Sequence, residues 1–291
     1  MNMVRVILAS VLLGTVLNGQ AQIPFDLAKP ARTYRLPPEL LEVSALTDVD
    51  DLTLACLHDE AAMLYLFDLR QGVIARRFSF GHPGDMEGLT RVGDQYFALR
   101  SDGLVYRLSL KGDAVQVLDT FRLALSNRNI EGLGYDERFD RVLVSPKDIP
   151  KGSPELRDVR VIHAFDARTG KVLPEPVLTL SINTLIDQAR AKGLTVPMRT
   201  TDNGREVPAL KLRFSSVAVD PRSDLIYLLS AVDRMVLVVD RQGDLVYLEQ
   251  LDARAHPKPE GITFLPAGDL LISNEGKGTA PSIVRFSRTS K

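Results

Sequence analysis

The sequence has few of the residues that soft-metal and redox sites use. Its 291 residues include one cysteine, Cys56, no tryptophan and four histidines. A single cysteine excludes both an intramolecular disulfide and a cysteine-rich zinc site. Cys56 lies in an apolar run and is expected to be a small buried core residue. Without tryptophan the chain has no indole ring to stack on a redox cofactor such as a quinone, and nothing else in the sequence indicates such a cofactor.

The sequence also has no marked excess of basic over acidic residues, or of acidic over basic ones. The chain has 36 basic and 37 acidic residues, a formal net charge of −1, and no long run of like charges. A nucleic-acid-binding domain usually has a basic excess on one face, so nucleic acid is not an expected partner. Apolar residues make up 45% and charged residues 25% of the chain, which is typical of a folded globular protein.

The N-terminus holds the one notable apolar run. Arg5 precedes the apolar stretch 6–17, and Gly19-Gln20-Ala21 follows it. This pattern predicts a secretory signal peptide, residues 1–21, cleaved after Ala21, with an uncleaved anchor as the alternative. The run is shorter than the roughly 20 residues that a membrane-spanning helix needs. We therefore expect a single mature domain, residues 22–291, in the periplasm or secreted, without an integral membrane segment.

The mature chain repeats itself. Five segments share a polar or acidic start followed by an alternating apolar run, and we align them on one central residue each. These central residues are Ser44, Glu87, Glu131, Ser215 and Glu260. The spacings between them are 43, 44, 84 and 45 residues, and three of the four match a four-stranded propeller blade of about 40–50 residues.

Short strands are expected after each repeat start. Runs such as Gln95–Leu99 and Met235–Val239 are rich in β-branched and aromatic residues, and turn residues such as Gly93-Asp94 separate them. Four such strands make one antiparallel sheet, whose faces become covered when several sheets surround one axis. The sequence therefore predicts an all-β protein, a β-propeller of five blades, with six blades as the alternative.

The long 84-residue interval and the last blade need separate explanations. Residues Ser181–Lys192 predict a helix, with Ser181 as N-cap and Gly193 as terminator, followed by a loop over residues 195–212. We therefore expect a helical insertion between the third and fourth blades rather than a sixth blade. The last blade shows only three strands, and Arg32–Leu36 is expected to pair with it as the closing fourth strand.

Acidic residues recur at the repeat starts. Radial symmetry directs equivalent residues of all blades toward the axis, so several carboxylates are expected to meet at one end of the channel. Carboxylates that lie together repel one another, and a hard cation such as calcium, which takes 6–8 oxygen ligands, relieves this repulsion. Two alternatives remain open: the acids cap loop amides and the Glu-Gly pairs mark tight turns, or Lys147 and Lys258 neutralise the acids directly.

The repeat motifs resemble those of a known family. The segments 42–46, 85–89, 129–133, 214–221, 259–262 and 273–276 are similar to the SdiA-regulated family of bacterial propellers, which is related to NHL-repeat and phytase-like propellers. The resemblance covers roughly residues 33–288 and implies a five-bladed calcium-binding propeller. The metal ligands that it implies are Asp85, Glu87, Glu131, Glu260 and Glu275. Ser44 and Ser215 replace the acid in two blades, so this ring is not fully acidic.

Two function classes follow from the sequence. It contains no Gly-x-Ser-x-Gly, no His-Glu-x-x-His and no phosphate-binding loop. We therefore expect a binding or scaffold protein outside the cytoplasm for a small molecule, glycan or protein, with the insertion at 181–212 shaping the binding face. The alternative is a calcium-dependent hydrolase of phosphate esters or lactones. In that alternative His82 or His256 acts as a base, and Lys147, Arg213 and Lys258 contact phosphate.

Overall fold

A computed structural model describes residues 23–127, 129–149, 154–276 and 278–289. The predicted signal peptide, residues 1–21, lies outside these described residues. Among the described residues, no helix is both long enough and apolar enough to cross a membrane.

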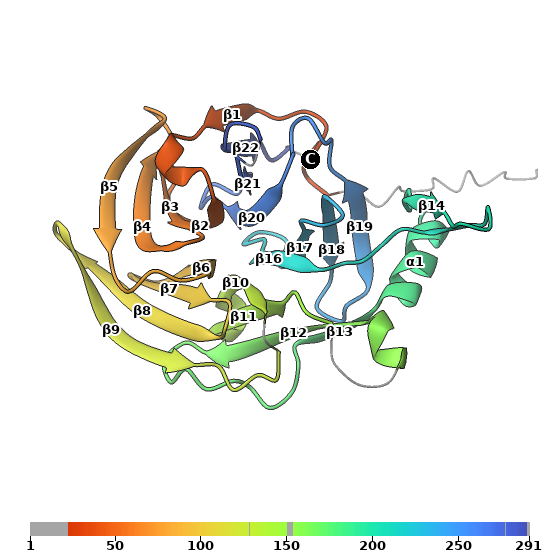
Figure 1. Ribbon diagram of the computed structural model, residues 1–291, viewed down its shortest axis with the longest axis horizontal. Helices are drawn as coiled ribbons and strands as arrows, with labels where there is room; N and C mark the ends of the chain where they lie inside the picture. Colours follow the sequence, from red (N-terminus) through yellow and green to blue (C-terminus); the bar gives the residue numbers. More distant parts are fainter. Residues whose placement is uncertain (1–22, 128, 150–153, 277, 290–291) are drawn as a thin grey trace, which may run out of the picture.

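Five four-stranded antiparallel sheets surround a central axis (Figure 1). The first sheet contains β2 (Val43–Asp50), β3 (Thr53–His58), β4 (Ala61–Asp68) and β5 (Val73–Ser79). The second contains β6 (Met86–Val92), β7 (Gln95–Arg100), β8 (Leu104–Lys111) and β9 (Ala114–Arg122). The third contains β10 (Ile130–Asp136), β11 (Arg141–Pro146), β12 (Val159–Asp166) and β13 (Leu178–Ser181). The fourth contains β16 (Phe214–Val219), β17 (Ile226–Ser230), β18 (Met235–Val239) and β19 (Leu245–Gln250). The fifth contains β20 (Pro259–Phe264), β21 (Leu270–Asn274), β22 (Ser282–Phe286) and β1 (Arg32–Arg35).

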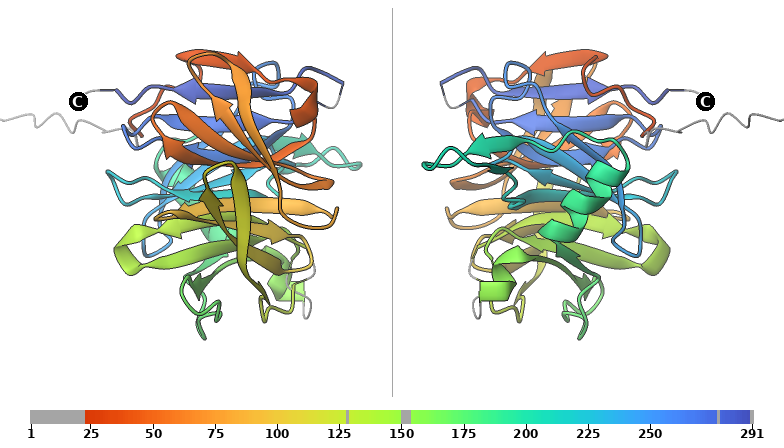
Figure 2. Two further views of the ribbon diagram at one scale, coloured as in Figure 1. Left: turned by 90° about the vertical axis from the view of Figure 1, so that its left-hand side faces the viewer. Right: turned by 90° about the vertical axis from the view of Figure 1, so that its right-hand side faces the viewer.

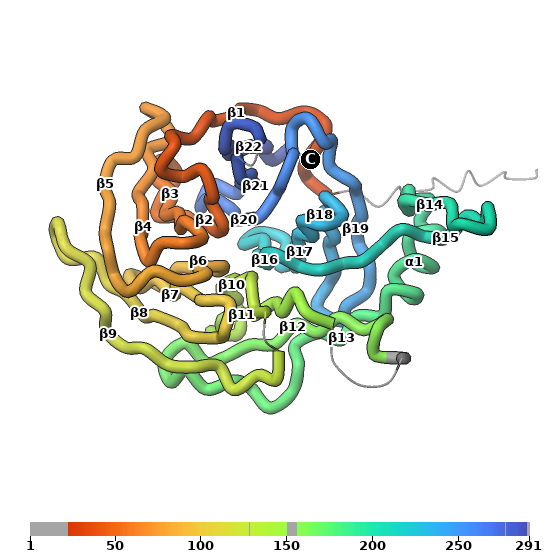
Figure 3. Tube along the Cα trace, viewed as in Figure 1, coloured from red at the N-terminus to blue at the C-terminus, as the bar shows by residue number. Residues whose placement is uncertain are grey.

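The closing strand confirms the five-bladed prediction. Strand β1 pairs antiparallel with β22, with Arg32 opposite Arg285 and Arg35 opposite Ser282. The trace in Figure 3 shows β1 beside β22, so the N-terminal segment completes the sheet that contains the last strands of the chain. The ring therefore closes by joining the two ends of the domain, and the prediction for Arg32–Leu36 is confirmed.

The core lies between neighbouring blades rather than inside one sheet. One buried cluster joins Leu57 and Phe78 of the first blade to Leu89 and Tyr96 of the second. Strand β18 is buried at all five positions, which its continuous apolar run predicts. Outer strand β9 is mostly exposed, and the side views of Figure 2 show the outer strands at the edge of the ring. Each blade thus depends on both of its neighbours for burial.

Small residues stand where the inner strands pass closest. The position after each aligned repeat residue holds Ala45, Gly88, Gly132, Ser216 or Gly261. A Cβ at Gly88 would lie 2.5 Å from the carbonyl oxygen of Glu131, and one at Gly132 would lie 2.8 Å from the Cα of Ser216. The Glu-Gly pairs of the repeat starts, at 87–88, 131–132 and 260–261, lie within strands β6, β10 and β20. These pairs therefore permit close approach of the strands and do not mark tight turns.

The insertion is a helix and a hairpin, as the long repeat interval predicts. Helix α1 (Ile182–Ala191) starts at Ser181, whose Oγ accepts a hydrogen bond from the Thr184 amide at 3.2 Å. Its buried face, which includes Leu185, packs against the outer strands β13 and β19. Strands β14 (Met198–Thr200) and β15 (Glu206–Pro208) then form a largely exposed hairpin. The helix therefore belongs to the core, and only the hairpin is free to shape a surface.

Candidate functional site

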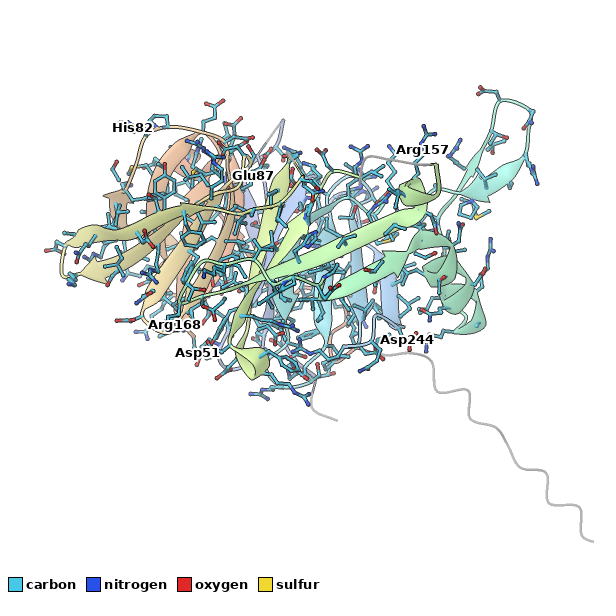
Figure 4. All side chains as sticks on the ribbon, turned by 90° about the horizontal axis from the view of Figure 1, so that it is seen from below. Asp51, His82, Glu87, Arg157, Arg168 and Asp244 are labelled. Carbon is cyan, nitrogen blue, oxygen red and sulfur yellow. The ribbon has the colours of Figure 1, made fainter. Side chains whose placement is uncertain are left out.

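The inner strands give the channel two chemically different ends. All five inner strands start at the same end, which we call the acidic mouth and define by Asp59, Asp85, Glu87, Glu131, Glu260 and Glu275. Figure 4 shows Glu87 on the same face as His82 and Arg157, with Asp51 and Asp244 on the opposite face. The hairpin of the insertion projects toward the face of Glu87 (Figure 4).

The blade repeat places two rings of residues at the acidic mouth. The first ring consists of the aligned repeat residues, which begin the inner strands. The second ring consists of the residue that directly follows the second strand of each blade. In the first, third and fifth blades, the backbone amide of this residue donates a hydrogen bond to the backbone carbonyl of a residue just before the inner strand of the same blade. Asp59 donates to Glu42 O at 2.9 Å, Lys147 to Asn129 O at 3.0 Å, and Glu275 to Lys258 O at 3.0 Å. Equivalent backbone positions therefore carry an acid in two blades and a lysine in another.

Three carboxylates form a compact cluster between the first and second blades. Oxygen atoms of Asp59, Asp85 and Glu87 lie within 4.8 Å of one another. The backbone holds the loops together, because the Met86 amide donates to Asp59 O at 2.7 Å. We call this group the carboxylate triad.

Burial and repulsion between carboxylates raise the pKa values of two triad members, Asp59 and Glu87. Burial, a hydrogen bond from Asp85 and the charge of Asp85 raise the pKa of Asp59 to about 7. Burial and the nearby charges of Glu131, Asp85 and Asp59 raise the pKa of Glu87 to about 9. Carboxylates with pKa values this high are poorly solvated and poorly paired, so the triad favours any species that brings positive charge.

Lysines partner the other acids of the mouth. Lys147 Nζ lies 2.5 Å from Glu131 Oε1, and the side-chain Nδ2 of Asn129 donates to the same oxygen at 3.2 Å. Lys258 Nζ lies 3.2 Å from Glu260 Oε1 and also forms an ion pair with Glu275. Burial still raises the pKa of Glu260 to about 7 against the lowering effect of Lys258 and Lys147.

The structure therefore divides the implied ligand set. Asp85 and Glu87 join the triad, whereas Glu131, Glu260 and Glu275 are paired with lysines at the same mouth. Sequence reasoning missed Asp59, although a signal was present. Asp59 follows Ser44 by 15 residues, the same interval that separates Glu275 from Glu260. Counting 15 residues on from the aligned repeat residue of the first blade would have identified Asp59.

The donor set of the triad fits a hard cation. Three carboxylates offer up to six oxygen atoms, and calcium prefers carboxylate oxygen over nitrogen or sulfur. Glu131 adds a buried Oε2 that has no hydrogen-bond partner among the described residues, and the charge of Glu131 acts on Glu87. A bound cation would supply the positive charge that Lys147 and Lys258 supply to the neighbouring acids.

The two histidines near the repeat starts differ in their surroundings. His82 is exposed in the loop before Asp85. His256 is fully buried and stacks on Phe286 with ring centroids 5.9 Å apart. Burial lowers the pKa of His256 to about 4. A side chain without solvent contact cannot exchange protons with a substrate at the mouth, so His256 is a core residue.

His256 gives the fold an expected acid sensitivity. The pKa of His256 is about 4 in the folded chain and near 6.5 when the side chain is exposed. The unfolded chain therefore takes up the proton at higher pH, and the folded state loses stability relative to the unfolded state as pH falls from 6.5 to 4. The expected loss is about 3 kcal/mol and arises from burial of the imidazole, which disfavours its charged form. Urea unfolding of His256→Gln should show a shallower pH dependence over this range. The exposed control His82→Gln should follow the wild-type curve, and parallel curves for all three proteins would refute this role.

Comparison with known proteins identifies a family and solved structures of similar fold. The sequence model of the SdiA-regulated family matches residues 38–277. The crystal structure of the Myxococcus xanthus glutaminyl cyclase superposes with a TM-score of 0.59 and 14% sequence identity, covering 89% of this chain and 95% of that one. At this identity the likeness shows a shared fold alone. No curated protein matches the chain.

Proposed function

The chain belongs to the SdiA-regulated family, and we propose that it is an exported β-propeller that binds calcium at the carboxylate triad and acts as a binding or scaffold protein. The observation that carries this proposal is the contrast within the acidic mouth. Glu131, Glu260 and Glu275 have lysine partners, whereas Asp59, Asp85 and Glu87 lie together in the triad. Burial and neighbouring acids raise the pKa values of Asp59 and Glu87.

Calcium would organise the mouth for binding. A cation on the triad would fix the loop of Asp59, between β3 and β4, against the segment that leads into β6. These segments and the β14–β15 hairpin lie on the same face of the ring (Figure 4). A partner that docks there would meet a rigid, cation-bearing centre beside an exposed hairpin. We infer that the partner is a small molecule, glycan or protein with anionic oxygen groups, because such groups complete the coordination of calcium.

A binding experiment on matched variants tests the calcium site. Equilibrium dialysis with calcium should show saturable binding to the wild-type protein and at least a tenfold loss for Asp59→Asn. The matched control is Asp113→Asn, which changes an exposed acid in the turn before outer strand β9. Equal binding by all three proteins would remove the triad from the proposal.

Turnover distinguishes a binding protein from a hydrolase. The calcium-loaded protein should leave p-nitrophenyl phosphate and simple lactones unchanged, because the proposed cation holds loops and partner rather than a reacting substrate. Of the two candidate bases, His256 is buried and His82 is exposed in the loop before Asp85. Calcium-dependent hydrolysis that disappears in Glu87→Gln would instead establish the hydrolase alternative, in which the cation polarises the substrate and activates water.

Export is tested by the mass of the mature chain. Ile23, Phe25 and Leu27 are buried in the core that also contains Tyr227 and Phe264. A cut after Ala21 leaves all three anchoring residues attached, so the mature domain keeps its packing. We expect mass spectrometry of the protein from its native host to show an N-terminus at Gln22. An intact residue 1 in the extracted protein would contradict export by cleavage.

A further inference from the structure

The end of the channel opposite the acidic mouth contains a cavity of 560 Å³. All five inner strands contribute to its wall, through their C-terminal halves and the turns that follow. Figure 4 places Asp51, which follows β2, on the face opposite Glu87. None of the six acids that define the acidic mouth lines this cavity. We call it the distal cavity.

A ring of aliphatic residues surrounds the inner end of the distal cavity. One residue comes from each blade, always two positions after the aligned repeat residue. The ring consists of Leu46, Leu89, Leu133, Val217 and Ile262. Each is at most 3% exposed, and each also packs in one of the cores between blades. The floor is therefore apolar and held in place by the core.

The wall above this floor offers neutral polar groups. Thr47, Thr90 and Thr263 line the distal cavity from three different blades, and Phe264 adds an aromatic side chain. A hydroxyl group donates and accepts hydrogen bonds, so a threonine wall recognises hydroxyl and carbonyl groups.

Charged residues at the rim are largely engaged with one another. Arg91 donates through Nε and a terminal nitrogen to Asp48, both at 2.9 Å, and through its other nitrogen to Gly93 O at 2.7 Å. Arg138 lies 2.5 Å from Asp224. Each nitrogen of the Arg91 guanidinium therefore already donates to the protein, and its charge is balanced by Asp48. Burying an unpaired ligand charge against the aliphatic floor would be unfavourable.

We propose that the distal cavity binds a neutral small molecule whose apolar ring or chain faces the aliphatic floor and whose hydroxyl or carbonyl group bonds to the threonines. Its volume falls within the range of about 300–1,000 Å³ typical of small-molecule sites, as does an apolar lining with a few placed polar groups. The site is separate from the carboxylate triad and needs no cation.

Three naphthalene probes of similar size, with a neutral, an anionic or a cationic substituent at position 1, test this specificity. Fluorescence titration of the purified protein should show saturable binding of neutral 1-naphthalenemethanol, with a dissociation constant of about 0.1–1 mM for a probe of this size. Anionic 1-naphthoate and cationic 1-naphthylmethylammonium should bind at least tenfold more weakly. Absence of saturable binding by the alcohol, or equal binding of all three probes, would overturn the proposal.

Matched variants locate the bound probe. Ala218→Leu adds volume to a cavity-lining residue and should weaken binding of the alcohol at least fivefold, whereas the same change at exposed Ala114 on outer strand β9 should not. Thr90→Val should weaken binding of 1-naphthalenemethanol but not of 1-methylnaphthalene, which has no hydroxyl group. The control is Thr120→Val, at an exposed position on outer strand β9, and it should bind both probes as the wild-type protein does. If Ala218→Leu does not fold, Thr90→Val decides alone, and unchanged binding of the alcohol would place the probe elsewhere.

Discussion

In calcium-free buffer at pH 7, Glu87→Gln is expected to be more stable than the wild-type protein, by on the order of 2 kcal/mol. The folded state raises the pKa of Glu87 from 4.5 to about 9, mainly through burial and the charge of Glu131. A group with a raised folded pKa loses stability as pH rises from 4.5 to 9, and glutamine has no charge to bury. Urea unfolding at pH 7 measures the difference.

Excess calcium is expected to reverse this order. A ligand at a hundredfold excess over its dissociation constant stabilises the folded state by about 2.7 kcal/mol, and only the protein with an intact triad receives that gain. The exposed control Glu175→Gln should follow the wild-type protein in both buffers. A variant that remains more stable than wild type in calcium would mean that Glu87 binds no cation. One that is less stable in both buffers would mean that the acid is structural.

Gly132→Ala is expected to destabilise the protein by about 3 kcal/mol, independently of calcium. The added methyl group would lie 2.8 Å from the Cα of Ser216, and this neighbour is backbone of the next inner strand. Neither strand can retreat, because each is held by its own sheet and by the core on both sides. Thermal unfolding with chelator present isolates this effect from the cation site.

Gly84→Ala is the matched control for this substitution. Its new methyl group would meet only the side chain of Arg100, at 2.9 Å, and a long side chain can move aside. We expect a change of less than about 1 kcal/mol there. Similar losses for both variants would show that close approach of the inner strands is not what the glycine provides.

The repeat explains why the fold could be predicted. Strand positions recur with the blade spacing, and Ser181, Ile182 and Gly193 carry local signals for a cap, a buried face and a terminator. Pairing of Arg32–Arg35 with β22 also followed from counting, because a blade with three strands needs a fourth. These features depend on local patterns and on ring closure, which a linear sequence records.

The site was harder to predict because it depends on contacts between blades. Sequence position identified Glu87, Glu131 and Glu260 as equivalent acids, but not which of them a lysine would neutralise. Lys147 pairs with Glu131 and Lys258 with Glu260, whereas Glu87 lies with Asp59 and Asp85. The acids differ in their partners in part because the residues of the second ring differ from blade to blade, although their backbone positions are equivalent. The distal cavity could not be predicted from the sequence for a related reason. The residues of its aliphatic floor follow the same apolar pattern as any buried strand, so the sequence does not show that they surround a cavity.

Thermal unfolding of the purified protein in excess calcium, excess magnesium and chelator tests the central claim most directly. The account predicts a calcium-specific rise in the melting temperature, because the folded state alone assembles Asp59, Asp85 and Glu87 into one site. It predicts a smaller rise with magnesium, which requires stricter octahedral geometry and dehydrates reluctantly. Identical melting temperatures in all three buffers, with no calcium in the protein by elemental analysis, would contradict the account.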